Sequence, residues 1–170
     1  MQETAEDLEQ LQQLLDHSYR NAGVHALEVI TPERRLDASR LCALLTDMCL
    51  LVVATTTRDG RPLTGPVDGY FFRGAWYFGS SKDAVRMGHL RTRPAVSATY
   101  LPSEELSVSV HGRATLIDHR SAGHAAFRAM LLERNLPLYG PEWEELIDTS
   151  GAYARIEADR MLTFFMPAPS

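Results

Sequence analysis

The stretch that decides the fold is VVATTTRDGRPLTGPVDGYFFRGAWYFGSSKDAVRMGHLRTRPAV, residues 52–96. Its first half is rich in β-branched and aromatic residues, which Asp59-Gly60 and Arg73-Gly74 interrupt. Such dipeptides between apolar runs are typical of hairpin turns. We therefore expect strands at about 49–57, 61–72 and 75–80, then a helix at 82–92 and a fourth strand at 95–101.

The end of the third expected strand carries a candidate phosphate site. Gly79, Ser80 and Ser81 lead into the expected helix, and Arg86 lies about one turn inside it. The free N–H groups and the positive dipole end of a helix N-terminus favour an anion. The pattern predicts a site for the phosphate of a cofactor. The alternative is an ordinary loop that enters a capped helix, with a solvated arginine.

Helices and further strands flank this stretch. An apolar stripe predicts a helix over 3–21, a connection at 24–36 follows, and Asp37 is placed to cap a second helix that runs to about Asp47. After Pro102, alternation predicts a long strand at 106–117. The remaining expected elements are helices at 119–134 and 142–148 and one or two closing strands, 152–156 and 161–165.

Short antiparallel strands with one helix between the third and the fourth exclude a parallel βαβ sheet. They indicate a mainly β fold, a small β-barrel with flanking helices. The length fits one domain over residues 1–170, with a helical extension at about 1–36. Because neighbouring residues of a strand face opposite sides, we expect one of Trp76 and Tyr77 in the core and the other on the surface.

Composition limits the classes of partner. The net charge is −5 and the sequence pI is about 5.7, whereas nucleic-acid-binding domains are usually basic. The longest apolar run, Met48–Ala54, is far shorter than the roughly 20 residues of a membrane helix. The acidic N-terminal region is unlike a signal peptide. We expect a cytoplasmic protein with no nucleic-acid or membrane partner.

The cysteines and histidines show no metal-binding pattern. Cys42 and Cys49 are the only cysteines, and both fall in apolar segments, so we expect two reduced, packed thiols. His119 and His124 are five residues apart, which does not place two ligands on one helical face, and there is no Cys-x-x-Cys. We predict no metal site.

The order of several short motifs resembles that of the pyridoxamine 5′-phosphate oxidase-like family. The resemblance covers residues 40–165, and the motifs are Asp59-Gly60-Arg61-Pro62, Pro66-Val67, Phe78-Gly79-Ser80, Leu90-Arg91, Pro94-Ala95-Val96-Ser97 and Gly112-Arg113-Ala114. It implies an antiparallel six-stranded split β-barrel that binds FMN. It also implies a homodimer with the cofactor at the subunit interface, and an oxidoreductase that transfers hydride between the flavin and a small-molecule substrate.

The resemblance further implies which residues bind the flavin. Gly79, Ser80 and Arg86 would hold its phosphate. Ser107 maps near a polar residue at the pyrimidine edge, and Phe164 near an aromatic residue that the second subunit contributes. The ring would lie on the second strand, at Thr64, Gly65, Pro66, Val67, Asp68 and Gly69. No catalytic residue is assigned.

The chain departs from the family pattern at several positions. Ala84 stands where serine is frequent, Arg86 where lysine is usual and His89 where asparagine is common. Arginine can hold a phosphate bidentately, whereas alanine removes a hydroxyl. True pyridoxamine phosphate oxidases end in an arm with an Arg-Leu-His-Asp-Arg-like segment. Because this sequence ends at Ser170 without one, we do not expect that specific activity.

Other interpretations stay open. Arg86, Arg91 and Arg93 could form a basic rim for the anionic tail of a deazaflavin coenzyme, or a solvated helix face. Haem is a known variation on this barrel, with His89 or His111 as a candidate axial ligand. The protein could also be a non-catalytic flavin or haem carrier.

Two further side chains have alternative roles beside the expected cofactor. Asp68 could be an acid/base group or a carboxylate at a turn or interface. Trp143 could close over a cofactor or anchor the short helix around it. The sequence does not separate these roles.

Overall fold

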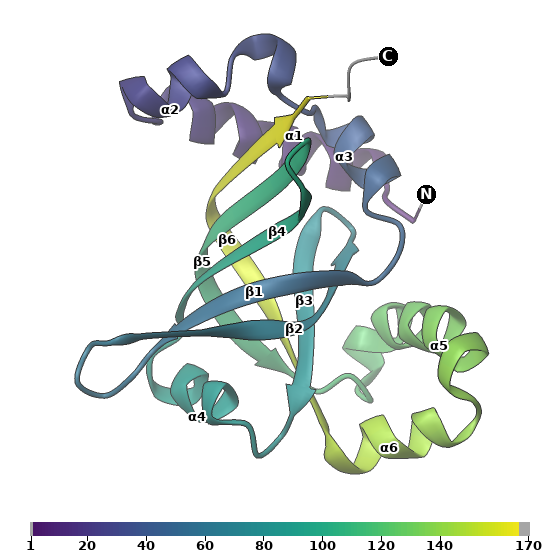
Figure 1. Cartoon of the computed structure of the whole chain (residues 1–170). Coiled ribbons are helices and arrows are strands. Elements are labelled where there is room, and N and C mark those ends of the chain that lie inside the picture. Colours follow the sequence, from purple (N-terminus) through teal and green to yellow (C-terminus); the bar gives the residue numbers. More distant parts are fainter. Residues whose placement is uncertain (1, 167–170) are drawn as a thin grey trace.

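Six antiparallel strands form a closed barrel in a computed structural model that describes residues 2–166 (Figure 1). Around the barrel their order is β1-β2-β3-β6-β5-β4. This confirms the predicted mainly β architecture. The strands are β1 (Cys49–Thr56), β2 (Pro62–Phe72), β3 (Ala75–Ser81), β4 (Ala95–Ser103), β5 (Leu106–Ile117) and β6 (Gly151–Phe165).

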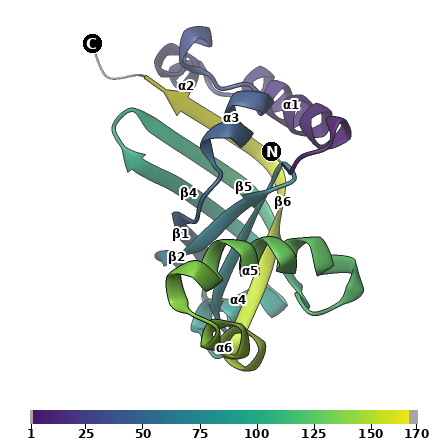
Figure 2. The ribbon, with the colours of Figure 1, turned by 90° about the vertical axis from the view of Figure 1, so that its right-hand side faces the viewer.

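Helices α1 to α3 lie at one end of the barrel and α4 to α6 lie toward the other, with α5 against the side of the barrel (Figure 2). Two 3₁₀ turns, Pro32–Arg34 and Ala122–His124, precede α3 and α5. The helices are α1 (Ala5–Arg20), α2 (Val24–Val29), α3 (Ala38–Leu44), α4 (Val85–Thr92), α5 (Ala125–Tyr139) and α6 (Glu142–Ser150).

The two predicted hairpin turns are present. Gly60 has a φ of 83°, and its N–H donates to the Thr57 carbonyl. Between β2 and β3, Phe72 pairs with Ala75, so that Arg73 and Gly74 alone form the turn, with φ values of 49° and 72°. A two-residue turn of this kind requires positive φ at both positions, and its twist matches that of the strands.

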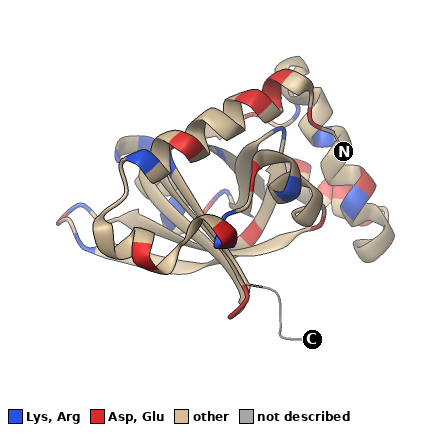
Figure 3. Ribbon diagram, turned by 90° about the horizontal axis from the view of Figure 1, so that it is seen from above, with Lys and Arg blue, Asp and Glu red and all other residues tan. Residues whose placement is uncertain are grey.

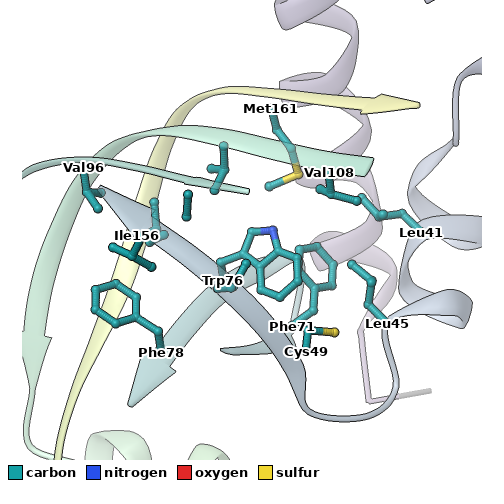
Figure 4. Packing of buried hydrophobic residues seen from close by; sticks show 14 of the residues in the cluster. Leu41, Leu45, Cys49, Phe71, Trp76, Phe78, Val96, Val108, Ile156 and Met161 are labelled. Atoms are coloured by element: carbon teal, nitrogen blue, oxygen red, sulfur yellow. The ribbon is translucent and has the colours of Figure 1, made fainter. Parts of the chain in front are cut away.

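The barrel interior is filled with apolar side chains around Trp76, which is fully buried (Figure 4). The Phe71 ring packs edge-on against Trp76, with 5.1 Å between centroids. Alternate residues of β1, β2, β3 and β5 point inward, as the strand period of two requires. The interior group labelled in Figure 4 is Leu41, Leu45, Cys49, Phe71, Trp76, Phe78, Val96, Val108, Ile156 and Met161.

A second apolar cluster lies outside the barrel, between β2, β3 and helices α5 and α6. Tyr77 belongs to it and stacks on Phe127 of α5 with 4.3 Å between centroids. The expectation that one of Trp76 and Tyr77 lies on the surface is therefore wrong. Both side chains are buried because α5 covers the outer side of β3. Strand periodicity distinguishes the two sides of a strand but does not show what covers them.

Helix α1 is fixed to the end of β6. The Tyr19 hydroxyl lies 2.8 Å from Thr163 Oγ1, and the Met161 N–H donates to Ser18 Oγ at 2.9 Å. At the start of the helix, Thr4 and Asp7 form a reciprocal capping box. The predicted cap of α3 is also present, since Asp37 accepts from the Arg40 N–H.

Several predicted boundaries were wrong for local reasons. Helix α3 ends at Leu44, before Asp47, since Leu45 leaves the helical path and enters the core. Helix α4 begins at Val85 because Ala84 before it has an extended backbone, with a ψ of 137°. Of the one or two closing strands predicted, residues 2–166 contain one, β6, which has a bulge rather than a break opposite His111 and Gly112.

The helix predicted at 119–134 begins and ends later in the structure. Residues 122–124 form a 3₁₀ turn, and α5 starts at Ala125. Pro137 does not end the helix, because a proline in the last turn removes only one intrahelical hydrogen bond. The helix stops after Tyr139, where Gly140 has a φ of 82°. The connection expected at 24–36 contains the short helix α2.

The predicted cysteine state is confirmed. Cys42 and Cys49 are free and buried. Burial raises the pKa of Cys42 to about 12 and that of Cys49 to about 11. Both side chains therefore stay thiols near neutral pH, packed like small apolar residues.

Acidic and basic positions are distributed over both helices and strands (Figure 3). Among residues 2–166, no helix combines the length and the apolar character needed to cross a membrane.

The bulge in β6 predicts a strong requirement for glycine at position 112. A Cβ there would lie 2.1 Å from the Glu157 carbonyl oxygen and 3.0 Å from the Asp159 nitrogen, both backbone atoms. We expect Gly112→Ala to lower the free energy of unfolding by about 1–3 kcal/mol, as overpacked sites do. Urea unfolding followed by circular dichroism measures the change.

Gly88 provides the matched control. It lies inside α4, and a Cβ there meets nothing within 4 Å. Gly88→Ala should raise stability by roughly 0.5–1 kcal/mol through helix propensity. Equal effects of the two substitutions would contradict the described bulge.

Candidate functional site

A hollow of about 280 Å³ lies on the outer side of β2, β3 and β6, with α6 along one wall. Strands β2 and β3 contribute Asp68, Tyr70, Gly79 and Ser80. Trp143, Leu146 and Ile147 of α6 face them, and Tyr153 of β6 completes this part of the lining. The hollow thus combines one carboxylate, several aromatic rings and apolar side chains.

Strand register explains why these residues meet. Gly79 pairs with Asp68 on one side and with Tyr153 on the other, so the three form one row across β2, β3 and β6. Gly79 leaves a notch in the middle of this row. A Cβ at Gly79 would lie 2.8 Å from Tyr153 Cε1, so a side chain there would press on the Tyr153 ring.

The turn after Gly79 leads into α4. The Asp83 N–H donates to Ser81 Oγ, and the Ala84 N–H donates to the Ser81 carbonyl. Ala84 is the N-cap of α4 and provides no side-chain cap. The first N–H groups of a helix have no intrahelical partner, so this end of α4 suits an anion.

Arg86 extends from the first turn of α4 to β2. Its Nη1 donates to the Gly65 carbonyl at 3.0 Å. An ideal Cβ on Gly65 would lie 2.8 Å from Arg86 Nη2, so this glycine gives the guanidinium its space. One hydrogen bond leaves most of the N–H donors of a guanidinium able to bind another acceptor.

The two phenols of the hollow remain protonated near neutral pH. Burial raises the pKa of Tyr70 to about 12, and its hydroxyl donates to Asn135 Oδ1 at 3.3 Å. Burial, together with the nearby Tyr70 and Asp68, raises the pKa of Tyr153 well above its ordinary value. Both side chains are therefore neutral hydrogen-bond donors.

An ion-pair network holds α6 against α5. Arg128 binds both carboxylate oxygens of Asp148, at 2.5 and 2.9 Å, and Glu144 at 2.7 Å. His119 Nε2 lies 3.1 Å from Asp148 Oδ1, and the His119 ring packs edge-on against Tyr153 with 5.0 Å between centroids. The network thus supports α6 and contacts Tyr153, two parts of the hollow's lining.

This network predicts that α6 loosens in acid. The hydrogen bonds from Arg128, and secondarily His119, lower the pKa of Asp148. The pKa of Asp148 is lower in the folded protein than in the unfolded chain. The ionised carboxylate therefore stabilises α6 fully when the pH is above the ordinary pKa of a carboxyl group. This stabilisation is lost as the pH falls through the lowered pKa. We expect Asp148→Asn to destabilise α6 by about 1 kcal/mol, as for a partly exposed ion pair. Hydrogen exchange of residues 142–150 at neutral pH measures this.

Asp118→Asn is the control, because the Asp118 carboxylate is exposed and pairs with Arg120 outside α6. It should leave exchange in α6 unchanged. If Asp148→Asn also left it unchanged, the network would not be what holds α6.

The structure brings only part of the predicted site together. Gly79, Ser80 and Asp68 line one hollow, and Gly65 contacts Arg86. The other predicted β2 positions, Thr64, Pro66, Val67 and Gly69, lie on the same strand. Val67 is buried, and a Cβ on Gly69 would lie 2.5 Å from the Leu51 side chain, so Val67 and Gly69 can offer only main-chain groups to a ligand outside the barrel.

Ser107 and Phe164 lie elsewhere in the chain. They pair with each other across β5 and β6. Ser107 lies on β5, which does not line the hollow, and Phe164 lies at the far end of β6 from Tyr153. Arg34 stacks on the Phe164 ring, 5.5 Å from its centroid. These two residues are therefore not part of the hollow within one chain.

The two candidate haem ligands are each bonded to a hydroxyl group. His89 Nδ1 lies 3.0 Å from Thr55 Oγ1, and His111 Nδ1 lies 2.8 Å from Ser97 Oγ. Within the described residues, no three His, Cys, Asp or Glu side chains gather as a metal site would require.

The sequence did not indicate several residues of the hollow. Tyr70, Leu146, Ile147 and Tyr153 carry no local motif, and their meeting depends on the pairing of β3 with β6 and on the docking of α6. Trp143, predicted to cover a cofactor or to anchor its helix, does line the hollow, and it also stacks on Tyr139.

Comparison with known proteins shows that other solved structures share the fold of this chain. No protein-family model matches the sequence, and no curated protein matches it. Among solved structures, the flavocytochrome Anf3 from Azotobacter vinelandii is 18% identical, with a TM-score of 0.62 over 88% of this chain and 75% of that one. The heme storage protein HutZ from Vibrio cholerae is 16% identical, with a TM-score of 0.61 over 75% of this chain and 92% of that one.

A proposed pyridoxamine 5′-phosphate oxidase from Listeria innocua is also similar. It is 14% identical, with a TM-score of 0.57 over 72% of this chain and 94% of that one. Identities this low establish architecture only. The resemblance predicted from the motifs is confirmed at that level: the chain folds as a six-stranded split β-barrel of the pyridoxamine 5′-phosphate oxidase-like type.

Proposed function

We propose that this protein binds FMN on the outer side of its barrel and acts as an oxidoreductase on a small molecule. The observation that carries the proposal is a set of anion-binding groups close together between β3 and α4. There Gly79, Ser80 and Ser81 at the end of β3, the uncapped start of α4 and the Arg86 guanidinium belong to one short segment beside β2. The likeness to a flavocytochrome supports the same class of cofactor.

The residues present fit FMN. The hydroxyls of Ser80 and Ser81 and the first N–H groups of α4 would bind the phosphate, with Arg86 as the counter-charge. The β2 backbone around Pro66 would support the ring, because Gly65 and Gly69 have no side chains and Val67 points into the barrel. When bound, FMN supplies hydride transfer, while the protein binds and orients it and excludes water.

A homodimer with the cofactor at its interface is part of the proposal. On the outer side of β1 and β4, Leu50, Val52 and Leu101 are 59%, 49% and 63% exposed. Leu50 pairs with Asp68, so this apolar face adjoins the hollow, and Ser107 and Phe164 lie on β5 and β6 beyond it. In an isologous dimer across this face, Ser107 and Phe164 of one copy would approach the hollow of the other.

Haem is a second candidate, favoured by the position of His111. When His111 Nδ1 donates to Ser97 Oγ, the lone pair lies on Nε2, which is an iron-binding atom. The likeness to the heme storage protein HutZ points the same way.

The test is reconstitution of the purified protein with FMN, followed by gel filtration with absorbance detection. A flavin spectrum that elutes with a dimer would support the proposal. A colourless protein would refute it. In that case, a Soret band after haem addition that His111→Ala removes would establish the haem alternative. Retention of a deazaflavin coenzyme would indicate a reductase that uses that coenzyme.

A further inference from the structure

We propose that the hollow beside α6 binds a small organic cation that carries an aromatic ring, with Asp68 as its counter-charge. Protonated arylalkylamines are the simplest members of this class. The inference rests on the proposed function in one respect, namely that this cation is the substrate that the flavin oxidises or reduces. The binding site itself is argued from the chemistry of the lining.

Asp68 determines the sign of the charge that we expect on the ligand. It is the only charged side chain of the lining, and within residues 2–166 it has no ion pair. Its neighbours in the row across the strands are Leu50 and Gly79, both uncharged. The Asp68 side chain is exposed to solvent at the edge of these walls, so its carboxylate is free to pair with a cation that enters the hollow.

The walls suit an aromatic cation. Tyr70, Tyr153 and Trp143 line the hollow together with Leu146 and Ile147. Both phenols stay neutral because burial raises their pKa values. Neutral aromatic rings attract cations through their π-faces and stack on other rings. The same faces do not attract anions.

Size limits the ligand to about one ring with a short side chain. Ligand pockets range from roughly 300 to 1,000 Å³, and the hollow, at about 280 Å³, lies at the lower limit. The notch over Gly79 separates Asp68 from Tyr153 in the row. A side chain on Gly79 would close this space, since its Cβ would already touch the Tyr153 ring.

The Ser81 end of the hollow lies toward α4, where the phosphate is proposed to bind. Ser81 lies two residues beyond Gly79 on β3, a distance of about 7 Å along a strand. At that end the basic residues are Lys82, whose Nζ donates to the Thr149 carbonyl, and Arg86. Asp68 would repel a phosphate placed at its own end. This division of charge favours an anionic cofactor tail at one end and a cationic substrate at the other.

The test compares three probes of the same shape on the purified protein, both before and after the addition of FMN. They are 2-phenylethylamine, a cation at neutral pH, the neutral 2-phenylethanol and the anion phenylacetate. Binding is followed by Trp143 fluorescence, with Trp143→Phe to show that the signal comes from the hollow and not from Trp76. An ion pair to an exposed carboxylate is worth up to about 1 kcal/mol, so we expect the amine to bind up to about fivefold more tightly than the alcohol.

Asp68→Asn should abolish that preference while leaving the alcohol's affinity unchanged. Asp59→Asn is the control, because Asp59 lies in the β1–β2 turn and pairs with Arg61. Equal binding of amine and alcohol by the unmodified protein, or tighter binding of phenylacetate, would overturn the inference without any variant. Because FMN retention is measured separately, a protein that retains no FMN but still prefers the amine would refute only the proposed function.

Discussion

An Arg86→Ala variant is expected to bind FMN about 10- to 100-fold more weakly than the unmodified protein. This range corresponds to losing hydrogen bonds from a charged donor to a phosphate. The guanidinium reaches β2 from the first turn of α4 and bonds to Gly65 with one nitrogen. Fluorescence titration of FMN gives the dissociation constant, and Arg91→Ala, at an exposed position near the other end of α4, should leave it unchanged.

A second substitution changes the position of the Arg86 guanidinium but keeps its positive charge. Gly65→Ala keeps Arg86 but places a Cβ 2.8 Å from Nη2, and the flexible guanidinium must move away. We expect Gly65→Ala to weaken FMN binding less than Arg86→Ala, with little loss of thermal stability. If FMN affinity were the same in all of these variants, the phosphate would not bind at Arg86.

The largest effect on stability is expected from Trp76→Ala, at about 3–5 kcal/mol. Large-to-alanine substitutions in a core lose transfer free energy and leave a cavity. Trp76 is fully buried at the centre of the barrel and packs edge-on against Phe71. Urea unfolding followed by circular dichroism measures the loss, and an unchanged slope against urea would show that the unfolded state is unaffected.

Trp76→Phe is the informative companion. Among the described residues, Trp76 Nε1 is buried and has no hydrogen-bond partner, and such a donor costs about 1–3 kcal/mol. Phenylalanine removes that donor and keeps most of the ring. We therefore expect Trp76→Phe to cost at least about 2 kcal/mol less than Trp76→Ala. Equal losses would mean that a retained aromatic ring does not restore the packing around position 76.

For the site, the sequence identified what lies within one segment. Gly79, Ser80 and Ser81 at the end of β3 and Arg86 are less than ten residues apart, so one strand, one turn and one helix position them all. Tyr153 and Trp143 could not be placed in this way. They reach the same surface only because β6 pairs with β3 and because Arg128 holds α6 through Asp148.

By itself, the sequence determined the local elements, the order of the strands along the chain and the two hairpin turns. These depend on interactions over a few residues, such as the positive φ of Gly74 or the cap at Asp37. Only the tertiary structure decided barrel closure, the burial of Tyr77 under α5 and the hollow that joins Asp68 to Tyr153. The physical reason is that a strand's period shows which residues share a side, whereas what covers that side depends on packing between distant segments.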